Sequence, residues 1–155
     1  MAAPVPAPTE ADVRFMRRAV ERARGLPGHP FAAVIADPAR HLVLAEGANR
    51  HEESAIWHGE VDAIARLDAI HPRGGRSGLT LYTTAEPCPM CQAAILWACI
   101  PRVVYGTSIP FLAAHGWWQI DLRATAVAAC APGRPCTIIG GVLEAECDAL
   151  FAAGP

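Results

Sequence analysis

Two short segments of the sequence combine residue types that can hold a metal ion. The first is His58-Gly59-Glu60, and the second is Pro87-Cys88-Pro89-Met90-Cys91. Two cysteines three positions apart at the start of a helix can point at one ion, and the helix N-terminus favours their thiolate forms. One nitrogen and two sulfur ligands suit Zn²⁺, and three protein ligands leave the fourth tetrahedral position open for water. The spacing therefore predicts a catalytic zinc site.

Glu60 follows the histidine by two positions, which places its carboxylate beside the ion instead of on it. A carboxylate there can take a proton from metal-bound water and deliver it to a leaving nitrogen. Zinc lowers the pKa of its bound water to about 7, so hydroxide is available at neutral pH. We therefore predict that Glu60 is the catalytic proton shuttle. The predicted zinc ligands are His58, Cys88 and Cys91.

The alternative is a purely structural zinc site that is closed by a fourth protein ligand. A lone Cys-x-x-Cys or His-x-Glu is a weak signal, whereas both in this order, each at a predicted helix start, are more specific. The fourth ligand would be another histidine or one of the remaining cysteines, Cys99, Cys130, Cys136 and Cys147. We expect these four cysteines to be small buried apolar residues instead. A closed site would also have no need of Glu60.

The elements that must position these segments alternate between strands and helices. A capping box at 9–12 and apolar residues at helical spacing predict a helix that ends at Gly25. Two β-prone runs, 31–36 and 41–46, predict a hairpin. Further strands are predicted at 79–84, 102–106 and 137–139, and further helices at 59–70, 89–98 and around 143–150. This order predicts an α/β domain, a three-layer α-β-α sandwich.

Composition and charge narrow the class of protein. The chain has 155 residues, is 52% hydrophobic and 18% charged, and carries a net charge of −2. Six cysteines without a signal sequence indicate a reducing, cytoplasmic compartment, and no apolar stretch reaches the roughly 20 residues of a membrane span. The Ala- and Pro-rich segment 1–8 is predicted to be a disordered tail, followed by one catalytic domain at 9–155.

The two metal-binding segments resemble the signature of the cytidine deaminase-like superfamily of zinc enzymes. The stretch Thr80–Cys91 is similar to the second half of that signature, and the resemblance extends from about residue 9 to residue 151. It implies a central five-stranded mixed sheet flanked by helices. It also implies a reaction in which hydroxide adds to an amidine carbon of a nucleobase and ammonia leaves.

Two branches of the superfamily are similar to different parts of the chain. The segments 30–35 and 46–50 resemble bacterial guanine deaminases, whereas 141–147 resembles the C-terminal helix of tRNA adenosine deaminases. The resemblance implies that Phe31 stacks on the base and that Asn49 holds its ring edge. It also implies a substrate contact from the backbone N–H of Gly59, where these families usually carry Ala or Cys.

One region departs from the guanine deaminase pattern. Those enzymes place an acidic residue near His115-Gly116-Trp117-Trp118-Gln119 to read guanine, and here tryptophans stand there. Trp118 is a candidate for the substrate pocket, and we expect at least one of the two tryptophans at a subunit interface. Glu86 is expected to fix the zinc loop by hydrogen bonding. The expected surface histidines are His29, His41, His51 and His71, whereas His115 lies in a loop that can border the site.

The predicted activity is zinc-dependent hydrolysis of a C–N bond in a free nucleobase or nucleoside, guanine or a related amino-purine or pyrimidine. Such an enzyme would serve nucleobase metabolism, for example purine salvage. The first alternative, deamination of adenosine in tRNA, would need a basic groove, and 13 basic against 15 acidic residues argue against nucleic acid. The second alternative is a non-catalytic structural zinc module. Four tryptophans and few charges predict a homodimer or larger homo-oligomer.

Overall fold

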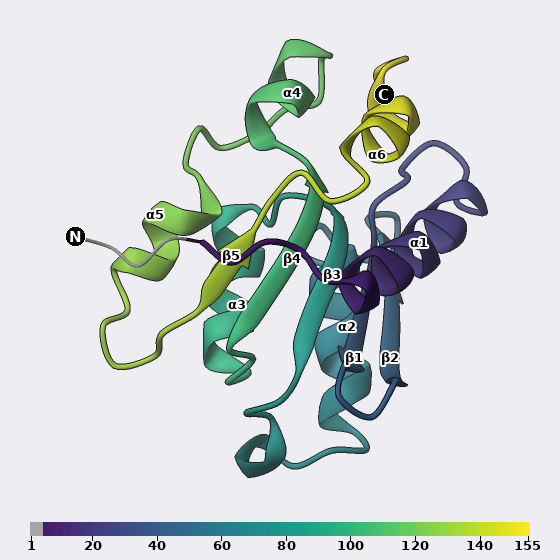
Figure 1. Cartoon of the computed structure of the whole chain (residues 1–155). Coiled ribbons are helices and arrows are strands. Elements are labelled where there is room, and N and C mark those ends of the chain that lie inside the picture. Colours follow the sequence, from purple (N-terminus) through teal and green to yellow (C-terminus); the bar gives the residue numbers. More distant parts are fainter. Residues whose placement is uncertain (1–4) are drawn as a thin grey trace.

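The computed structural model describes residues 5–155, which fold around one five-stranded sheet (Figure 1). The strand order is β2-β1-β3-β4-β5, with β1 antiparallel to both of its neighbours and β3, β4 and β5 mutually parallel. The strands are β1 (Ala32–Asp37), β2 (Leu42–Ala48), β3 (Thr80–Ala85), β4 (Arg102–Thr107) and β5 (Thr137–Ile139). The predicted mixed sheet is thereby confirmed.

Helices cover both faces of the sheet and complete the predicted three layers (Figure 1). One face carries α1 (Glu10–Arg24) and α6 (Glu144–Phe151), and the other carries α2 (Gly59–Asp68), α3 (Pro89–Trp97) and α5 (Ala124–Ala129). The short helix α4 (Ile109–Ala114) follows β4, and the 3₁₀ helix η1 is Arg73–Gly75. Each face of the sheet has its own apolar core, because every residue of β1 and β3 is buried.

The predicted start of α1 is confirmed. The Thr9 side chain accepts a hydrogen bond from the Asp12 backbone N–H, and the Asp12 carboxylate accepts one from the Thr9 N–H. These reciprocal bonds satisfy two of the free amides at the helix start. Of the predicted tail, residues 5–8 are exposed and form no secondary structure, whereas residues 1–4 lie outside the described part.

Two of the expectations for the cysteines are wrong. Cys99 and Cys130 are exposed, whereas Cys147 is buried and Cys136 half-buried. Cys99 lies just after α3 with a φ of 60°, and Cys130 ends α5, so both belong to turns at helix ends and not to a core face. Among the helices of residues 5–155, none is long and apolar enough to cross a membrane.

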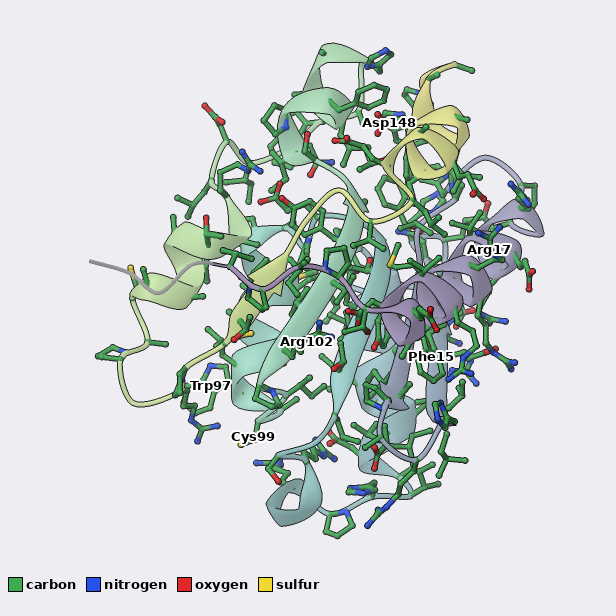
Figure 2. The ribbon with its side chains drawn as sticks, viewed as in Figure 1. Phe15, Arg17, Trp97, Cys99, Arg102 and Asp148 are labelled. Atoms are coloured by element: carbon green, nitrogen blue, oxygen red, sulfur yellow. The ribbon has the colours of Figure 1, made fainter. Side chains whose placement is uncertain are left out.

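An ion pair between the half-buried Arg102 and the buried Asp12 joins α1 to β4. Arg102 on β4 reaches α1, the helix that carries Phe15 (Figure 2), and its two terminal nitrogens donate to the Asp12 carboxylate at 2.6 and 2.8 Å. The Tyr82 hydroxyl donates to the same carboxylate at 3.0 Å. Burial raises the pKa of Asp12, but the Arg102 guanidinium and the Thr9 amide more than offset it, so that this pKa is lowered from 3.8 to about 2.

Removing this ion pair gives a pH-dependent loss of stability. We expect Arg102→Met to lower the free energy of unfolding by about 3–5 kcal/mol at pH 7, because the Asp12 carboxylate stays buried without its counter-ion. The depressed pKa means that the wild-type contribution is fully present above pH 3.8 and is lost as the pH falls through about 2. Urea unfolding at pH 7, 4 and 2.5 measures this.

The exposed pair of Arg17 and Glu146, 3.6 Å apart, is the matched control for that prediction. Arg17→Met is expected to change the free energy of unfolding by less than about 1 kcal/mol, because a solvated pair gains little. An equal loss in both variants, or a loss at Arg102 that stays constant down to pH 2.5, would contradict the assignment to the buried pair.

Close backbone packing sets where α2 begins. A Cβ at Gly47 on β2 would lie 2.0 Å from the carbonyl oxygen of Gly59, and a Cβ at Gly59 would lie 3.0 Å from the carbonyl oxygen of Phe31. Only glycine at position 47 allows this contact, and glycine at position 59 lets the helix start press against the end of β1. The segment His58–Glu60 is thereby fixed at the edge of the sheet.

Candidate metal centre and active site

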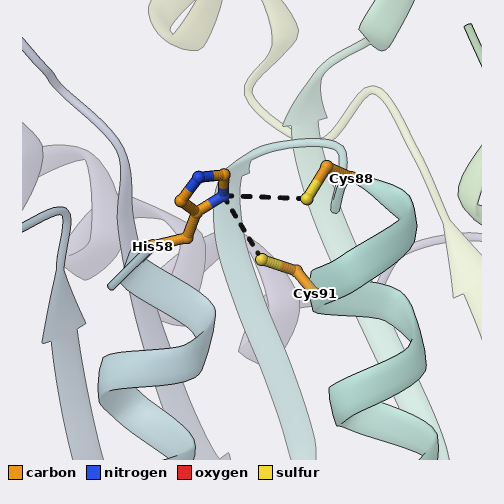
Figure 3. Close-up of side chains that lie close together, drawn as sticks. All are labelled: His58, Cys88 and Cys91. Atoms are coloured by element: carbon orange, nitrogen blue, oxygen red, sulfur yellow. Dashed lines mark hydrogen bonds between the residues drawn. The ribbon is translucent and has the colours of Figure 1, made fainter. Parts of the chain in front are cut away.

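Three side chains from two helix starts converge on one point (Figure 3). His58 is the N-cap of α2, Cys88 is the N-cap of α3, and Cys91 lies in the first turn of α3. The Nδ1 atom of His58 lies 3.6 Å from the Cys88 sulfur and 3.5 Å from the Cys91 sulfur. One ligand atom from each residue falls within 4.8 Å of the other two, which is the predicted triad.

The geometry of this triad fits Zn²⁺. A tetrahedral zinc with Zn–S bonds of about 2.3 Å and Zn–N bonds of about 2.0 Å separates nitrogen from sulfur by about 3.5 Å. The two measured nitrogen–sulfur distances, 3.6 and 3.5 Å, match this spacing. The nitrogen that faces the sulfurs is Nδ1, so Nδ1 is the donor atom available to the ion. Three protein donors leave one tetrahedral position for a fourth ligand.

The protonation of the two thiols also suits a cation between them. Hydrogen bonding with Cys91 and His58 lowers the pKa of Cys88 to about 4, against the opposing effect of burial. The pKa of Cys91 is raised, because this thiol donates to Cys88 and is buried. Hydrogen bonding with Cys88 raises the pKa of His58. A metal ion takes up the deprotonated forms of these three groups, so its binding would release the protons that they still hold.

Glu60 lies directly beside this triad, on the first turn of α2. Its side chain is buried, with 5% of the residue exposed. The Thr83 hydroxyl on β3 lies 3.2 Å from Oε1 of Glu60 and 3.1 Å from the Ala85 carbonyl oxygen, so that its one proton serves either acceptor. Burial raises the pKa of this carboxyl group, and the nearby Cys88 thiolate raises it further. A carboxyl group whose pKa is raised above its ordinary value is suited to both accept and release a proton.

A cavity of about 370 Å³ opens onto the metal triad. Its wall contains His58, Glu60 and Cys88, so a molecule in it reaches both the metal position and the carboxylate. Three further predicted residues, Phe31, Asn49 and Trp118, lie in the same wall. Gly59 does not line it and instead packs its backbone against Phe31. The remaining lining residues are His29, His51, Ala85, Glu86, Gly116, Trp117, Gln119 and Pro155.

The two adjacent tryptophans have different surroundings. Trp117 is buried, meets Phe31 and Phe151 edge-on at 5.2 and 5.7 Å, and donates its indole N–H to the Phe151 carbonyl at 2.9 Å. Trp118 is 83% exposed at the cavity rim. Trp117 therefore braces Phe31, whereas Trp118 is free to meet a ligand or another subunit. His115 stacks on Phe111 outside the cavity wall.

Glu86 links the segment before Cys88 to two short helices. Its carboxylate accepts hydrogen bonds from the backbone amides of Ile109 and Ala124, both at 3.0 Å, and from Arg123 at 2.9 Å. Ile109 starts α4 and Ala124 starts α5, so the carboxylate satisfies free amides at two helix starts. The sequence suggested hydrogen bonds from Glu86 to the zinc loop alone, whereas its carboxylate binds the starts of α4 and α5 and the Arg123 side chain.

Several residues of the site were missed by sequence reasoning. His51 is exposed, as expected, and His29 is half-buried, but both also line the cavity, where their tilted rings have centroids 3.8 Å apart. Thr83 next to Glu60 and Arg123, which binds Glu86, were also missed. For Thr83 a clue existed, because alternate residues of a strand face the same side and this strand leads into the metal loop.

A family model described as the cytidine and deoxycytidylate deaminase zinc-binding region matches residues 9–107, which include both metal-binding segments. A probable cytosine deaminase of Schizosaccharomyces pombe is 31% identical over 103 residues, 64% of this chain and 62% of that relative's length. The tRNA-specific adenosine deaminase of Rickettsia bellii is 35% identical over 127 residues, 81% of this chain and 83% of that protein.

Several solved structures share the fold of this chain. A variant of the protein NE0047 in complex with 8-azaguanine has a TM-score of 0.77 at 27% identity, covering 90% of this chain and 81% of that one. A structure from work on deaminases of the wobble position of transfer RNA has a TM-score of 0.70 at 28% identity, covering 89% and 99%. A guanine deaminase from Nitrosomonas europaea, 24% identical with a TM-score of 0.76, shares the fold over 96% and 93%.

Proposed function

This chain belongs to the family of zinc-binding cytidine and deoxycytidylate deaminases and is a hydrolytic deaminase. We propose that its substrate is a free nucleobase or a small relative of one. The observation that carries the proposal is the joint position of the metal triad and Glu60 in the wall of one cavity. A base in this cavity would have its reacting carbon next to both.

Within that reaction the protein's own residues hold the base and move protons. Zinc, when bound by the triad, supplies Lewis acidity and activates water at neutral pH. Glu60 accepts a proton from the attacking water and delivers it to the ring nitrogen, and a second transfer lets the amino group leave as ammonia. The Thr83 hydroxyl contacts Oε1 of Glu60. The other carboxylate oxygen, Oε2, is therefore available for these proton transfers. Water adds, ammonia leaves, and the ring keeps a carbonyl.

The cavity fits one planar base. Its volume of about 370 Å³ is at the small end of the range for small-molecule sites, roughly 300–1,000 Å³. Phe31 supplies an aromatic face braced by Trp117, and Asn49 supplies a polar edge. NE0047, which shares the fold, binds 8-azaguanine and 2,6-diaminopurine, two purine-like bases. We propose the same class of ligand for this chain, guanine or a related amino-purine or pyrimidine, and with it a role in nucleobase metabolism.

Deamination of adenosine in tRNA is the second candidate, favoured by the relative of Rickettsia bellii at 35% identity. Charge argues against it. A protein that neutralises several phosphates needs a basic groove, whereas this chain has a net charge of −2. The helix α6 contributes only acidic charges, from Glu144, Glu146 and Asp148.

Ammonia release distinguishes these two substrates. We expect the zinc-loaded protein to release ammonia from at least one member of a panel of guanine, isoguanine, cytosine, adenine and their nucleosides, and not from a tRNA anticodon hairpin. The measurement is ammonia release at equal substrate concentration, with the Glu60→Ala variant as the blank. Reaction with the hairpin alone would overturn the proposed substrate and support the tRNA activity.

We also propose that the chain forms a homodimer or a larger homo-oligomer. Trp97 at the end of α3 is 73% exposed and borders a cavity of about 430 Å³ between α2 and α3. Large exposed apolar side chains of this kind mark interfaces. Sedimentation at micromolar concentration is expected to show a dimer or larger species, and Trp97→Asp is expected to shift it toward monomer. A wild-type monomer would contradict this proposal.

A further inference from the structure

The side-chain amide of Asn49 is held in one orientation. Its Oδ1 lies 3.0 Å from the backbone nitrogen of His51. A backbone N–H can only donate, so the atom that faces it must be the amide oxygen and not the NH₂ group. This bond is an Asx turn, in which an Asn side chain accepts from the amide two residues later. The backbone bond therefore identifies Oδ1 as the amide atom that faces residue 51.

The imidazole ring of His51 adds a second bond to the same oxygen. Its Nδ1 lies 2.8 Å from Oδ1 of Asn49. Because the amide oxygen is an acceptor, Nδ1 must carry a proton in this contact. Both bonds consume the acceptor end of Asn49. In the described residues 5–155 no protein acceptor binds Nδ2, and Asn49 lines both the catalytic cavity and a neighbouring cavity of about 230 Å³.

A third residue keeps the His51 ring in place. His29, just before β1, packs against the His51 ring in a tilted arrangement with centroids 3.8 Å apart and meets Trp117 edge-on at 5.7 Å. Burial lowers the pKa of His29, and the neighbouring His51 lowers it further, so a neutral ring stacks here. Both rings separate the catalytic cavity from a second one of about 230 Å³, which they also line. Neither histidine contacts the metal triad.

We propose that His51, held by His29, is a positioning residue that fixes the Asn49 amide with its NH₂ group toward the cavity, so that the substrate base must present a hydrogen-bond acceptor there. This inference rests on the proposed function. It narrows the substrate to bases whose edge carries a carbonyl oxygen or an unprotonated ring nitrogen at that place. A base that offers an N–H there would meet another donor and be rejected.

A series of substitutions at position 51 separates the hydrogen bond from ring stacking. In His51→Asn the new side-chain NH₂ group is two bonds from Cβ, the same separation as Nδ1 in histidine. This NH₂ group can therefore still donate to Oδ1 of Asn49. His51→Phe keeps a ring against His29 but has no donor, and His51→Ala loses both. We expect His51→Asn to keep KM within about twofold, and His51→Phe and His51→Ala to raise it roughly 3- to 10-fold with kcat nearly unchanged.

The base itself supplies a second comparison. Where the best free base offers a ring nitrogen to Nδ2 of Asn49, an analogue with that nitrogen replaced by C–H has no acceptor there. The KM of this analogue is therefore expected not to change on substitution of His51. The inference is overturned if His51→Asn and His51→Phe raise KM equally, or if neither changes it. It is also overturned if the analogue responds to His51→Phe as strongly as the parent base does.

An activity-independent measurement keeps this inference separate from the proposed function. ¹⁵N NMR of the zinc-loaded full chain reports which ring nitrogen of His51 carries the proton, with His51→Phe used to assign the signal. A proton on Nδ1 supports the fixed amide, and a proton only on Nε2 overturns it. If no free base reacts, the proposed function fails, and the NMR result still decides whether His51 holds Asn49.

Discussion

Glu60→Ala is expected to retain one zinc per chain and the wild-type fold while kcat falls by at least ~10²–10⁴-fold, the typical contribution of a general acid–base group. The physical reason is that one buried carboxylate serves both proton transfers, to the ring nitrogen and to the leaving amine. Its burial and its bond from Thr83 hold it beside the metal triad. No second carboxylate in the cavity wall can replace it, because the Glu86 carboxylate is bound by Arg123 and two helix amides.

Two matched variants sharpen this experiment. Glu60→Gln keeps the shape of the side chain and an oxygen that can accept from Thr83, but it cannot take up a proton, so its kcat is expected to fall as far as that of Glu60→Ala. Glu53→Ala removes an exposed glutamate outside the cavity and is expected to leave kcat unchanged. Metal analysis and circular dichroism accompany the kinetics. Loss of zinc in Glu60→Ala would make this residue a ligand, and unchanged turnover would remove it from the mechanism.

Loss of a sulfur ligand is expected to abolish both metal binding and turnover. Cys91→Ala leaves only His58 and Cys88 as donors of the triad, and two donors hold zinc far more weakly than three. We expect about one zinc per wild-type chain, much less than one in the variant, and ammonia release at the level of the blank. Chelation of the wild type is expected to have the same effect, reversed by adding Zn²⁺.

The control for this prediction is a cysteine away from the triad. Cys130 is exposed at the end of α5, and Cys130→Ser is expected to keep both zinc and activity. The melting temperature of the wild type is expected to drop on chelation, because zinc binds the folded chain and stabilises it by mass action. Full zinc content in Cys91→Ala would show that another residue completes the site and would reject the three-ligand assignment.

Features that depend on residues a few positions apart could be predicted from the sequence alone. The capping box of α1 joins residues only three positions apart, and Cys88 and Cys91 lie within one helical turn. The local backbone geometry of a helix start sets the relative positions of these residues, whatever the rest of the fold. The alternation of strands and helices also predicted the layers and every strand, because buried strands and amphipathic helices have different periodicities. The helices α4 and α5 were missed, since six residues are too few to show a period.

The surroundings of the metal triad depend on contacts between elements that are distant in the sequence. His29 precedes β1 and His51 follows β2, and the antiparallel pairing of these strands brings the two rings together at the cavity wall. Thr83 meets Glu60 because β3 passes beneath the start of α2, and Glu86 finds its partners on helices that no pattern predicted. These contacts join residues 22 to 38 positions apart. Their geometry arises from packing between elements, which local spacing does not encode.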